Sequence, residues 1–240
     1  MTFFKKLFKK SAEEDNKGLS NQENKTSFKS SEVPIKKVMS EVYSKKKWGG
    51  SKYDFYSGFG SHSKKVVKPY VKTISEFLNS HSNSLLVCDL GCGDFNVGSQ
   101  LVKFSKEYIG VDVVEELIER NKKLFTDEKL SFQCLNIVEE SLPKTDCILV
   151  RQVLQHLSNN DIKKVVEKFK AYKYVIVTEH LPKRTFMANL DKITGANIRL
   201  SRNSGVVLHE NPFNIAAKSR EELLRIKYNK GIIVTTLYNF

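Results

Sequence analysis

Apolar runs alternate with amphipathic stretches along most of this chain, and that alternation predicts an α/β fold. Residues 85–88 form an unbroken apolar run, which is typical of a strand buried on both faces of a parallel sheet. Similar runs at residues 108–112, 131–135, 146–150 and 174–178 predict four further strands. We therefore expect a sheet that is mostly parallel.

Apolar residues with helical spacing fill the intervals between the strands. They predict helices over residues 34–43, 66–78, 97–104 and 115–124. A further helix, carrying His156, is expected after the fourth strand. Alternating strands and helices predict a three-layer arrangement with the sheet in the middle.

The chain ends in a pattern that is typical of a β-hairpin. Residues 221–228 and 232–238 flank Asn229-Lys230-Gly231, a turn sequence. A hairpin here would close the sheet with an antiparallel pair of strands.

The first predicted strand leads directly into Asp89-Leu90-Gly91-Cys92-Gly93. Glycines at 91 and 93 let the backbone turn tightly and approach a ligand closely. A strand, a glycine loop and a helix in this order form a nucleotide-type site at the carboxyl end of the strand. The dinucleotide fingerprint fails because Asn96 stands where it needs a glycine, and the P-loop pattern fails as well. The Asp89 carboxylate suits a ligand with a positive end, such as an ammonium or a sulfonium.

Two more strand ends carry polar residues that suit the same ligand. Asp112 lies 19 residues after Gly93, which is the spacing of an acid that holds ribose hydroxyls. Asn136 follows the third strand and can hydrogen-bond an amine. Three polar strand ends in register favour one nucleoside-containing cofactor.

The segment from Asp89 to Gly93 resembles the first motif of class I S-adenosylmethionine-dependent methyltransferases. A narrower resemblance, over about residues 40–215, is to bacterial members that act on small-molecule or glycan substrates. It rests on the motifs Trp48-Gly49, Ser57-Gly58-Phe59-Gly60-Ser61, Asp89 to Phe95, and Arg151 to Leu157. Gln152 departs from this pattern, because an Asp is common at that place.

The resemblance implies a Rossmann-like methyltransferase sheet, mostly parallel, with a closing antiparallel C-terminal hairpin. It implies S-adenosyl-L-methionine as cofactor. It also implies methyl transfer to an oxygen or nitrogen of a small-molecule or glycan-related acceptor, and an anionic acceptor is one form of this prediction. The residues expected to contact the cofactor are Trp48, Asp89, Gly91, Gly93, Asp94, Phe95, Asp112, Val113, Asn136, Ile137 and Arg151.

Four residues are candidates for the catalytic side of the site. Arg151, at the end of the fourth strand, is suited to binding an anionic acceptor. His156 either removes a proton from the acceptor or packs its own helix. Glu179 and His180, after the fifth strand, are candidates for a second base or an acceptor-binding pair. No H-x-x-x-H pattern is present, so no metal site is expected.

Three regions are expected along the chain. Residues 1–32 are basic and polar, which is typical of a largely disordered tail. Residues 33–82 are an N-terminal helical and aromatic–glycine lid region, which either covers the cofactor or is a loop pinned to the core. Residues 83–240 are the cofactor-binding core, with an acceptor-binding insertion at 181–213.

The net charge of +13 is spread over single lysines without an arginine-rich run. The sequence after the fourth strand is Arg-Gln-Val-Leu, whereas amine-methylating enzymes of nucleic acids carry Asn/Asp-Pro-Pro-Tyr/Phe there. Both observations argue against a nucleic-acid partner. An RNA or protein methyltransferase, and a non-catalytic interaction protein, stay open as alternatives.

A cytoplasmic location is expected, because the four cysteines fit buried reduced thiols and no apolar run approaches the roughly 18 residues of a membrane span. Phe3, Phe4, Leu7 and Phe8 share one helical face among lysines. This N-terminal segment is either a frayed tail or a weak contact to the inner membrane surface.

Overall fold

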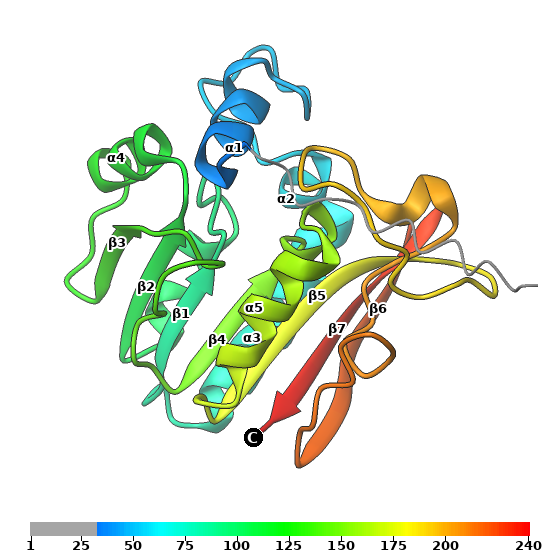
Figure 1. Cartoon of the computed structure of the whole chain (residues 1–240). Helices are drawn as coiled ribbons and strands as arrows, with labels where there is room; N and C mark the ends of the chain where they lie inside the picture. The colour runs from blue at the N-terminus through cyan, green and yellow to red at the C-terminus, as the bar shows by residue number, and fades with distance from the viewer. Residues whose placement is uncertain (1–32) are drawn as a thin grey trace, which may run out of the picture.

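The computed structural model describes residues 33–240, and within them one seven-stranded sheet carries helices on both faces (Figure 1). The strand order is β3-β2-β1-β4-β5-β7-β6. The strands are β1 (Leu86–Leu90), β2 (Glu107–Asp112), β3 (Leu130–Cys134), β4 (Cys147–Arg151), β5 (Tyr174–Pro182), β6 (Ser219–Tyr228) and β7 (Gly231–Asn239). The predictions for the N-terminal tail concern residues 1–32, which lie outside the described residues.

The predicted sheet type is confirmed. β1 to β5 pair in parallel, whereas β7 pairs antiparallel with both β5 and β6. The hairpin turn consists of Asn229 and Lys230, and Asn229 adopts a left-handed φ of 48°.

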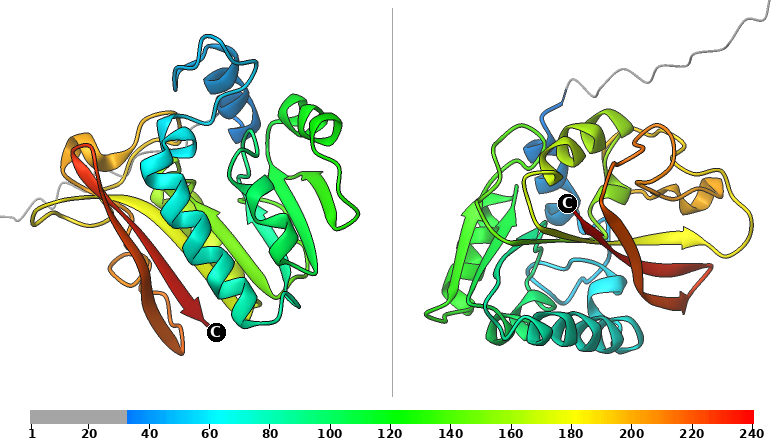
Figure 2. Two further views of the ribbon diagram at one scale, coloured as in Figure 1. Left: turned by 180° about the vertical axis from the view of Figure 1, so that it is seen from behind. Right: turned by 90° about the horizontal axis from the view of Figure 1, so that it is seen from below.

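Helices cover both faces of the sheet. The α-helices are α1 (Ile35–Ser44), α2 (Phe59–His62), α3 (Lys64–Ser80), α4 (Glu115–Leu124) and α5 (Asn159–Phe169). Figure 2 shows α3 along one face and α5 along the opposite face. α1 and α2 lie near the carboxyl ends of the parallel strands (Figure 1).

Three predicted elements were wrong in type or extent. The helix predicted to carry His156 is a 3-10 turn at that residue, and the α-helix begins only at Asn159. Residues 97–104 form two 3-10 turns, η1 (Gly98–Gln100) and η2 (Val102–Phe104), in place of an α-helix. Gly98 and Ser99 at its start are poor helix formers, which weakens an α-helix there. β5 continues four residues beyond the predicted end, because it pairs with β7 as far as Pro182 and Gly231. Two further 3-10 turns are η3 (Leu154–His156) and η4 (Arg199–Arg202).

Alternation along the strands divides the core into two layers. In β1, Val87 belongs to the cluster that includes α3, whereas Cys88 and Leu90 belong to the cluster that includes α5. Asp89 is therefore on the α3 side of the sheet. In β4 the same alternation puts Arg151 on the α3 side, where its guanidinium lies over the Tyr70 ring of α3.

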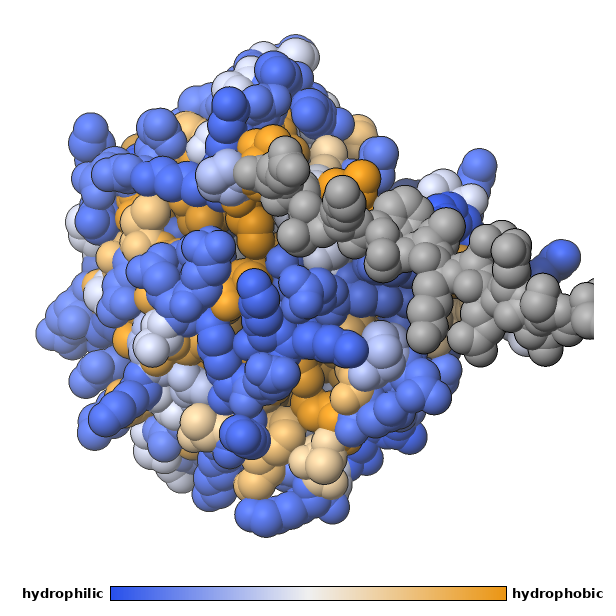
Figure 3. All heavy atoms as spheres, viewed as in Figure 1, coloured by the Kyte–Doolittle hydropathy of each residue, from blue (hydrophilic) through white to orange (hydrophobic). Residues whose placement is uncertain are grey.

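All four cysteines are free thiols, but their burial differs from the expectation. Cys88 and Cys147 are buried, Cys92 is half-buried and Cys134 is exposed. The exposed position follows from β3 being the edge strand of the sheet. None of the helices in the described part of the chain is long and apolar enough to cross a membrane. Hydrophilic side chains dominate the face of the molecule in Figure 3.

Candidate active site

The glycine loop after β1 takes a conformation that only glycine adopts easily. Gly91 and Gly93 have φ angles of 72° and 57°. A Cβ on Gly91 would come within 2.5 Å of the Val153 side chain, and one on Gly93 within 2.2 Å of Ser57 Oγ. The amides of Gly91 and Cys92 both donate to the Val111 carbonyl, which ties the loop to the end of β2.

A cavity of about 850 Å³ lies over the carboxyl ends of the parallel strands. Its walls come from α1, the glycine loop, the ends of β2, β3 and β4, residues 196–200 and the β6–β7 turn. Residues 57–61 also contribute a wall, and we call residues 53–62 the lid tip. A cavity of this size falls in the range of about 300–1,000 Å³ that small-molecule and cofactor sites occupy.

Asp112 and Asp89 are two of the buried acids of this cavity. Asp112 accepts hydrogen bonds from the Gly93 amide at 3.2 Å and the Val114 amide at 3.1 Å. Asp89 accepts one from the Tyr108 hydroxyl at 2.9 Å. Burial raises the pKa of each carboxyl to about 6, so both titrate just below neutral pH.

Of the residues predicted to contact the cofactor, all but one line the cavity. Those that line it are Trp48, Asp89, Gly91, Gly93, Asp94, Asp112, Val113, Asn136, Ile137 and Arg151. The exception is Phe95, which has a positive φ of 62° and a fully buried ring packed against Phe125 and Phe132. Phe95 supports the loop from behind. Asn136 shapes its own turn, since its side-chain oxygen accepts from the Val138 amide.

Asp94 holds the lid tip against the glycine loop. Its Oδ2 accepts from the Ser57 amide at 2.8 Å and lies 2.6 Å from His62 Nε2. The Asp94 amide in turn donates to Ser57 Oγ at 2.7 Å. The carboxylate expected to face the cofactor is thus engaged with the segment above it.

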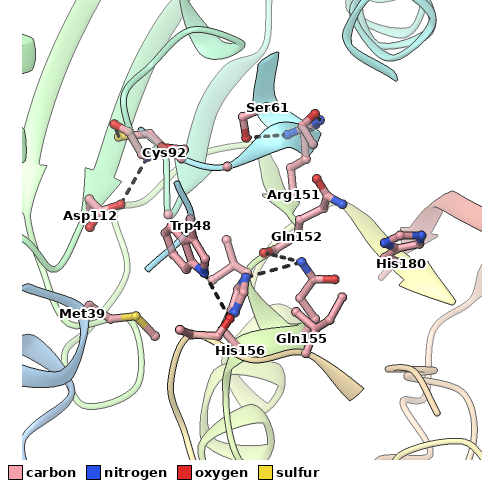
Figure 4. A pocket seen from close by; sticks show the side chains of 18 of the residues that line it. Met39, Trp48, Ser61, Cys92, Asp112, Arg151, Gln152, Gln155, His156 and His180 are labelled. Atoms are coloured by element: carbon pink, nitrogen blue, oxygen red, sulfur yellow. Dashed lines mark hydrogen bonds between the residues drawn. The ribbon is translucent and has the colours of Figure 1, made fainter. Parts of the chain in front are cut away.

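Arg151 also binds the lid tip. Its Nη2 donates to the Gly60 carbonyl at 2.5 Å and its Nη1 to Ser61 Oγ at 3.1 Å (Figure 4). Among the described residues, Arg151 Nε has no hydrogen-bond partner. The guanidinium therefore keeps one free donor while it joins β4 to the lid tip.

His156 lies in the cavity wall with both ring nitrogens engaged. Its Nδ1 donates to the Gly195 carbonyl at 3.2 Å, and its Nε2 lies 3.4 Å from Gln155 Nε2, which acts as donor (Figure 4). The Trp48 ring packs on it at 4.9 Å, and Trp48 Nε1 donates to the Ala196 carbonyl. Burial, helped by the nearby Lys192 ammonium, lowers the pKa of His156 to about 4, so the ring is neutral.

Glu179 and His180 were expected to supply a second base or an acceptor-binding pair, and the structure separates the two side chains. Successive residues of β5 point to opposite faces of the sheet. His180 lines the cavity, whereas Glu179 does not and is buried on the other side. Burial raises the pKa of the Glu179 carboxyl to about 8, and neither of its oxygens has a hydrogen-bond partner in residues 33–240.

Several cavity residues were not predicted from the sequence. Ser57 holds Asp94 together with His62, which lies outside the cavity lining, and Tyr70 lies under Arg151. Tyr228, at the end of β6, and Lys230, in the hairpin turn, also line the cavity. The Ser-Gly-x-Gly-Ser motif marked the first of these contacts. No local pattern indicates that the hairpin turn folds back over the strand ends.

Comparison with known proteins agrees with this geometry. Residues 88–172, from β1 to the end of α5, match the family model described as a methyltransferase domain. Over this stretch the chain is similar to methyltransferase domains. The matched stretch contains the glycine loop, Asp112 and Asn136, and ends before the segment that contributes residues 196–200.

Two solved structures illustrate the shared fold. The N-methyltransferase NodS from Bradyrhizobium japonicum WM9, in complex with S-adenosyl-L-homocysteine, is 13% identical with a TM-score of 0.57, covering 83% of this chain and 98% of that chain. Magnesium protoporphyrin IX methyltransferase from Synechocystis PCC 6803, with bound S-adenosyl-L-homocysteine, is 16% identical with a TM-score of 0.55, covering 86% and 100%. At these identities the likeness concerns the fold alone.

A sequence relative adds a different substrate class. An uncharacterized RNA methyltransferase from Clostridium acetobutylicum is 32% identical over 133 residues, which is 53% of this chain. The chain spans only 28% of the length of that relative.

Proposed function

We propose that this protein binds S-adenosyl-L-methionine and transfers its methyl group to an oxygen or nitrogen of a small-molecule or glycan-related acceptor. The observation that carries the proposal is one continuous cavity. It joins the glycine loop and the acids of β1 and β2 to a second compartment over β4 and β5. The cofactor supplies an electrophilic methyl group on a sulfonium. The protein has to bind it, align the acceptor and exclude water.

The compartment over β1, β2 and β3, which we call the cofactor half, has the chemistry that this cofactor requires. Asp112 would accept hydrogen bonds from the ribose hydroxyls, and Asn136 lies where an adenine amine would be placed. Val113 and Ile137 provide apolar surface for the adenine ring. The fit is supported by Gly91 and Gly93, since a side chain at either position would collide with its surroundings.

The amino-acid end of the cofactor would lie between Asp89 and Arg151. Both are on the α3 side of the sheet, and the guanidinium contributes to the electrostatic surroundings of the carboxyl. Asp89 and Arg151 both line the cavity, and a carboxylate beside an arginine suits a zwitterion, whose ammonium and carboxylate each meet the opposite charge. On this proposal Arg151 serves the cofactor and the lid tip, in place of an anionic acceptor.

The compartment over β4 and β5, which we call the acceptor half, has a different character. It is lined by Trp48, Gln152, Gln155, His156, His180, Tyr228 and Lys230. The carboxylates that line the cavity, Asp89, Asp94 and Asp112, all lie on the glycine loop or at the ends of β1 and β2. An uncharged or anionic acceptor suits this half better than a cationic one.

Calorimetric titration with S-adenosyl-L-homocysteine tests the cofactor assignment. Micromolar binding is expected for the wild-type protein, with clear weakening in Asp112→Ala. Titration with 5′-methylthioadenosine, which lacks the amino-acid end, separates the two parts of the site. Arg151→Met should weaken S-adenosyl-L-homocysteine and leave 5′-methylthioadenosine unchanged. A folded wild-type protein that binds neither ligand would contradict the enzyme proposal and favour a non-catalytic interaction protein.

RNA is the second candidate acceptor, favoured by the 32% identity to an RNA methyltransferase over 133 residues. A single base extruded into the acceptor half would be treated like a small molecule. Incubation of the protein with tritiated cofactor and separate small-molecule, RNA and protein fractions of a bacterial extract distinguishes the classes. We expect label in the small-molecule fraction, and label confined to RNA would replace the first proposal with the second.

A further inference from the structure

His180 lines the cavity from β5, whereas His156, the other histidine of the lining, lies after β4. It belongs to β5, where its backbone pairs with Ile233 of β7, and its side chain lies in the acceptor half. Its exposed fraction is 8%, so the ring is held within the protein and still borders the cavity. Figure 4 shows it on β5, separated from Trp48 by the side chains of Gln152 and Gln155.

The hydrogen bonds of the ring define its tautomer. His180 Nε2 lies 3.2 Å from the Tyr228 carbonyl, which can only accept, so Nε2 carries the proton. For Nδ1 there is no hydrogen-bond partner within residues 33–240, and this atom is not among their buried unpartnered ones. Nδ1 therefore presents a lone pair at an accessible position.

Gly231 provides the space in which the ring lies. A Cβ at this position would come within 2.6 Å of His180 Nε2 and 2.7 Å of its Cδ2. The C-terminal hairpin thus holds the imidazole through the Tyr228 carbonyl, and the absence of a side chain at Gly231 leaves room for the ring in this position. Such fixation is what a proton acceptor needs to meet its substrate in one geometry.

The other groups that line the cavity are less suited to accept a proton. His156 has both ring nitrogens engaged and the Trp48 ring against it. Asp89, Asp94 and Asp112 lie in the cofactor half and are bound by Tyr108, the lid tip and backbone amides. The other charged side chains in the lining near the strand ends of β4 and in the hairpin turn, Arg151 and Lys230, are cations.

We propose that Nδ1 of His180 is the general base of this methyltransferase, and that the acceptor is therefore a hydroxyl or a neutral amine that still carries its proton. This inference rests on the proposed function. The acceptor oxygen or nitrogen attacks the methyl carbon, and the bond from that carbon to sulfur breaks with its electrons going to sulfur. The proton of the acceptor passes to Nδ1, and the resulting imidazolium returns it to solvent after the products leave. An acceptor that is already deprotonated, such as a carboxylate, would not need this residue.

Burial lowers the pKa of His180, and among its causes only the Tyr228 carbonyl raises it. The residue is therefore neutral at pH 7 and ready to accept a proton. General base catalysis of this kind is worth about 10²- to 10⁴-fold in rate.

The first test needs no acceptor. We expect NMR of the full chain labelled with ¹⁵N-histidine, saturated with S-adenosyl-L-homocysteine, to show His180 neutral at pH 7 with the proton on Nε2. The signal is assigned by its loss in His180→Gln. A proton on Nδ1, or a charged ring at pH 7, would overturn the proposal.

The second test compares three variants in methyl transfer to the fraction that wild type labels. His180→Gln keeps a donor for the Tyr228 carbonyl and removes the base, so a rate loss of about 10²-fold or more is expected with unchanged affinity for S-adenosyl-L-homocysteine. Gly231→Ala should lose rate as well, because it displaces the ring. His209→Gln, at an exposed histidine outside the cavity lining, is the matched control, and an equal rate loss in it would contradict the assignment to His180. Absence of label with wild type would contradict the proposed function, while the NMR result still decides the tautomer.

Discussion

The acids of the cavity are held by backbone amides and side chains of the protein itself. Asp112 is fixed by the amides of Gly93 and Val114, and Asp89 by the Tyr108 hydroxyl. Burial raises the proton affinity of both carboxyls, and it outweighs the hydrogen bonds from Tyr108, Gly93 and Val114, which lower it. Cofactor binding and protonation therefore compete at the same oxygens.

This competition predicts a pH-dependent affinity. The pKa of Asp112 is raised to about 6, so its carboxylate is ionised above that pH and protonated below it. Calorimetry should show S-adenosyl-L-homocysteine binding more weakly as the pH falls from 7.5 through 6 to 5. Asp112→Asn should cost about 1.5–3 kcal/mol of binding at pH 7.5, the usual range for hydrogen bonds to a charged group, and should flatten the pH dependence. Wild-type affinity that is constant from pH 7.5 to 5 would contradict this account.

The pKa of Glu179 predicts that the free energy of unfolding decreases as the pH rises, whereas the affinity for the cofactor is expected to increase with pH. Its pKa rises from about 4.5 in the unfolded chain to about 8 in the folded one, so the folded state holds the proton more tightly. Its contribution to the free energy of unfolding is therefore complete below about pH 4.5 and is lost as the pH rises to 8, at about 1.4 kcal/mol per unit. Glu179→Gln should raise the stability in urea at pH 8 and change it little at pH 5. Equal effects at both pH values would show that the carboxyl is ionised when folded.

At the scale of single residues, the sequence predicted which polar residues belong to the site better than it predicted which groups they contact. Asp89, Asp112 and Asn136 follow strands, so alternation and strand length suffice to place them. Asp94 and Arg151 were assigned to ligands, yet they bind Ser57, Gly60 and Ser61 of the lid tip. Those contacts join residues 37 to 91 positions apart in the chain, and no local pattern contains such information.

At the scale of elements, the lid tip combines exposed aromatic rings with polar contacts to the glycine loop and β4. Its aromatic residues Tyr53 and Phe59 are 50% and 69% exposed, whereas its polar contacts to Asp94 and Arg151 are short. Gly49, Gly50 and Gly58 have positive φ angles, and a Cβ on Gly49 would meet open space. The segment is thus bounded by residues with wide backbone freedom, as hinges often are.

The lid tip should therefore control the exchange of the cofactor. Asp94→Asn removes the charge that holds Ser57 and His62, and we expect the dissociation of S-adenosyl-L-homocysteine to become about tenfold faster, equivalent to ~1.4 kcal/mol. Stopped-flow displacement measures this rate. Lys72→Ala, which alters an exposed ion pair with Glu76 on α3, is the control with an unchanged rate. Dissociation from Asp94→Asn at the wild-type rate would show that the lid tip does not gate the site.

Elements were predicted well where a local pattern decides them. The strands and the helices α1, α3 and α4 have clear apolar periodicity, and the hairpin has a turn sequence. The end of β5 was missed because its length depends on pairing with β7, about 50 residues later in the chain. Tertiary pairing of this kind overrides local propensity.

For the whole molecule, the net charge of +13 and the deep cavity over the strand ends point toward different acceptors. Positive charge favours a polyanion such as RNA, which binds by releasing counterions. A cavity walled by α1, the lid tip, residues 196–200 and the hairpin turn favours an acceptor that enters completely. Electrostatic attraction to a polyanion depends strongly on the salt concentration, whereas binding inside the cavity does not. A change of salt concentration therefore distinguishes the two kinds of acceptor.

An RNA substrate that contacts 6–10 phosphates loses about 10³- to 10⁵-fold in affinity between roughly 50 and 200 mM salt. A small acceptor enclosed by the cavity is held by hydrogen bonds and apolar contacts, which salt screens little. Methyl transfer at limiting acceptor should accordingly change by less than about threefold over this range, as measured with tritiated cofactor. S-adenosyl-L-homocysteine affinity at both salt concentrations is the control, because the cofactor site is the same for either acceptor. A steep loss of transfer at constant cofactor affinity would identify the lysine-rich surface as part of the acceptor site and make RNA the substrate.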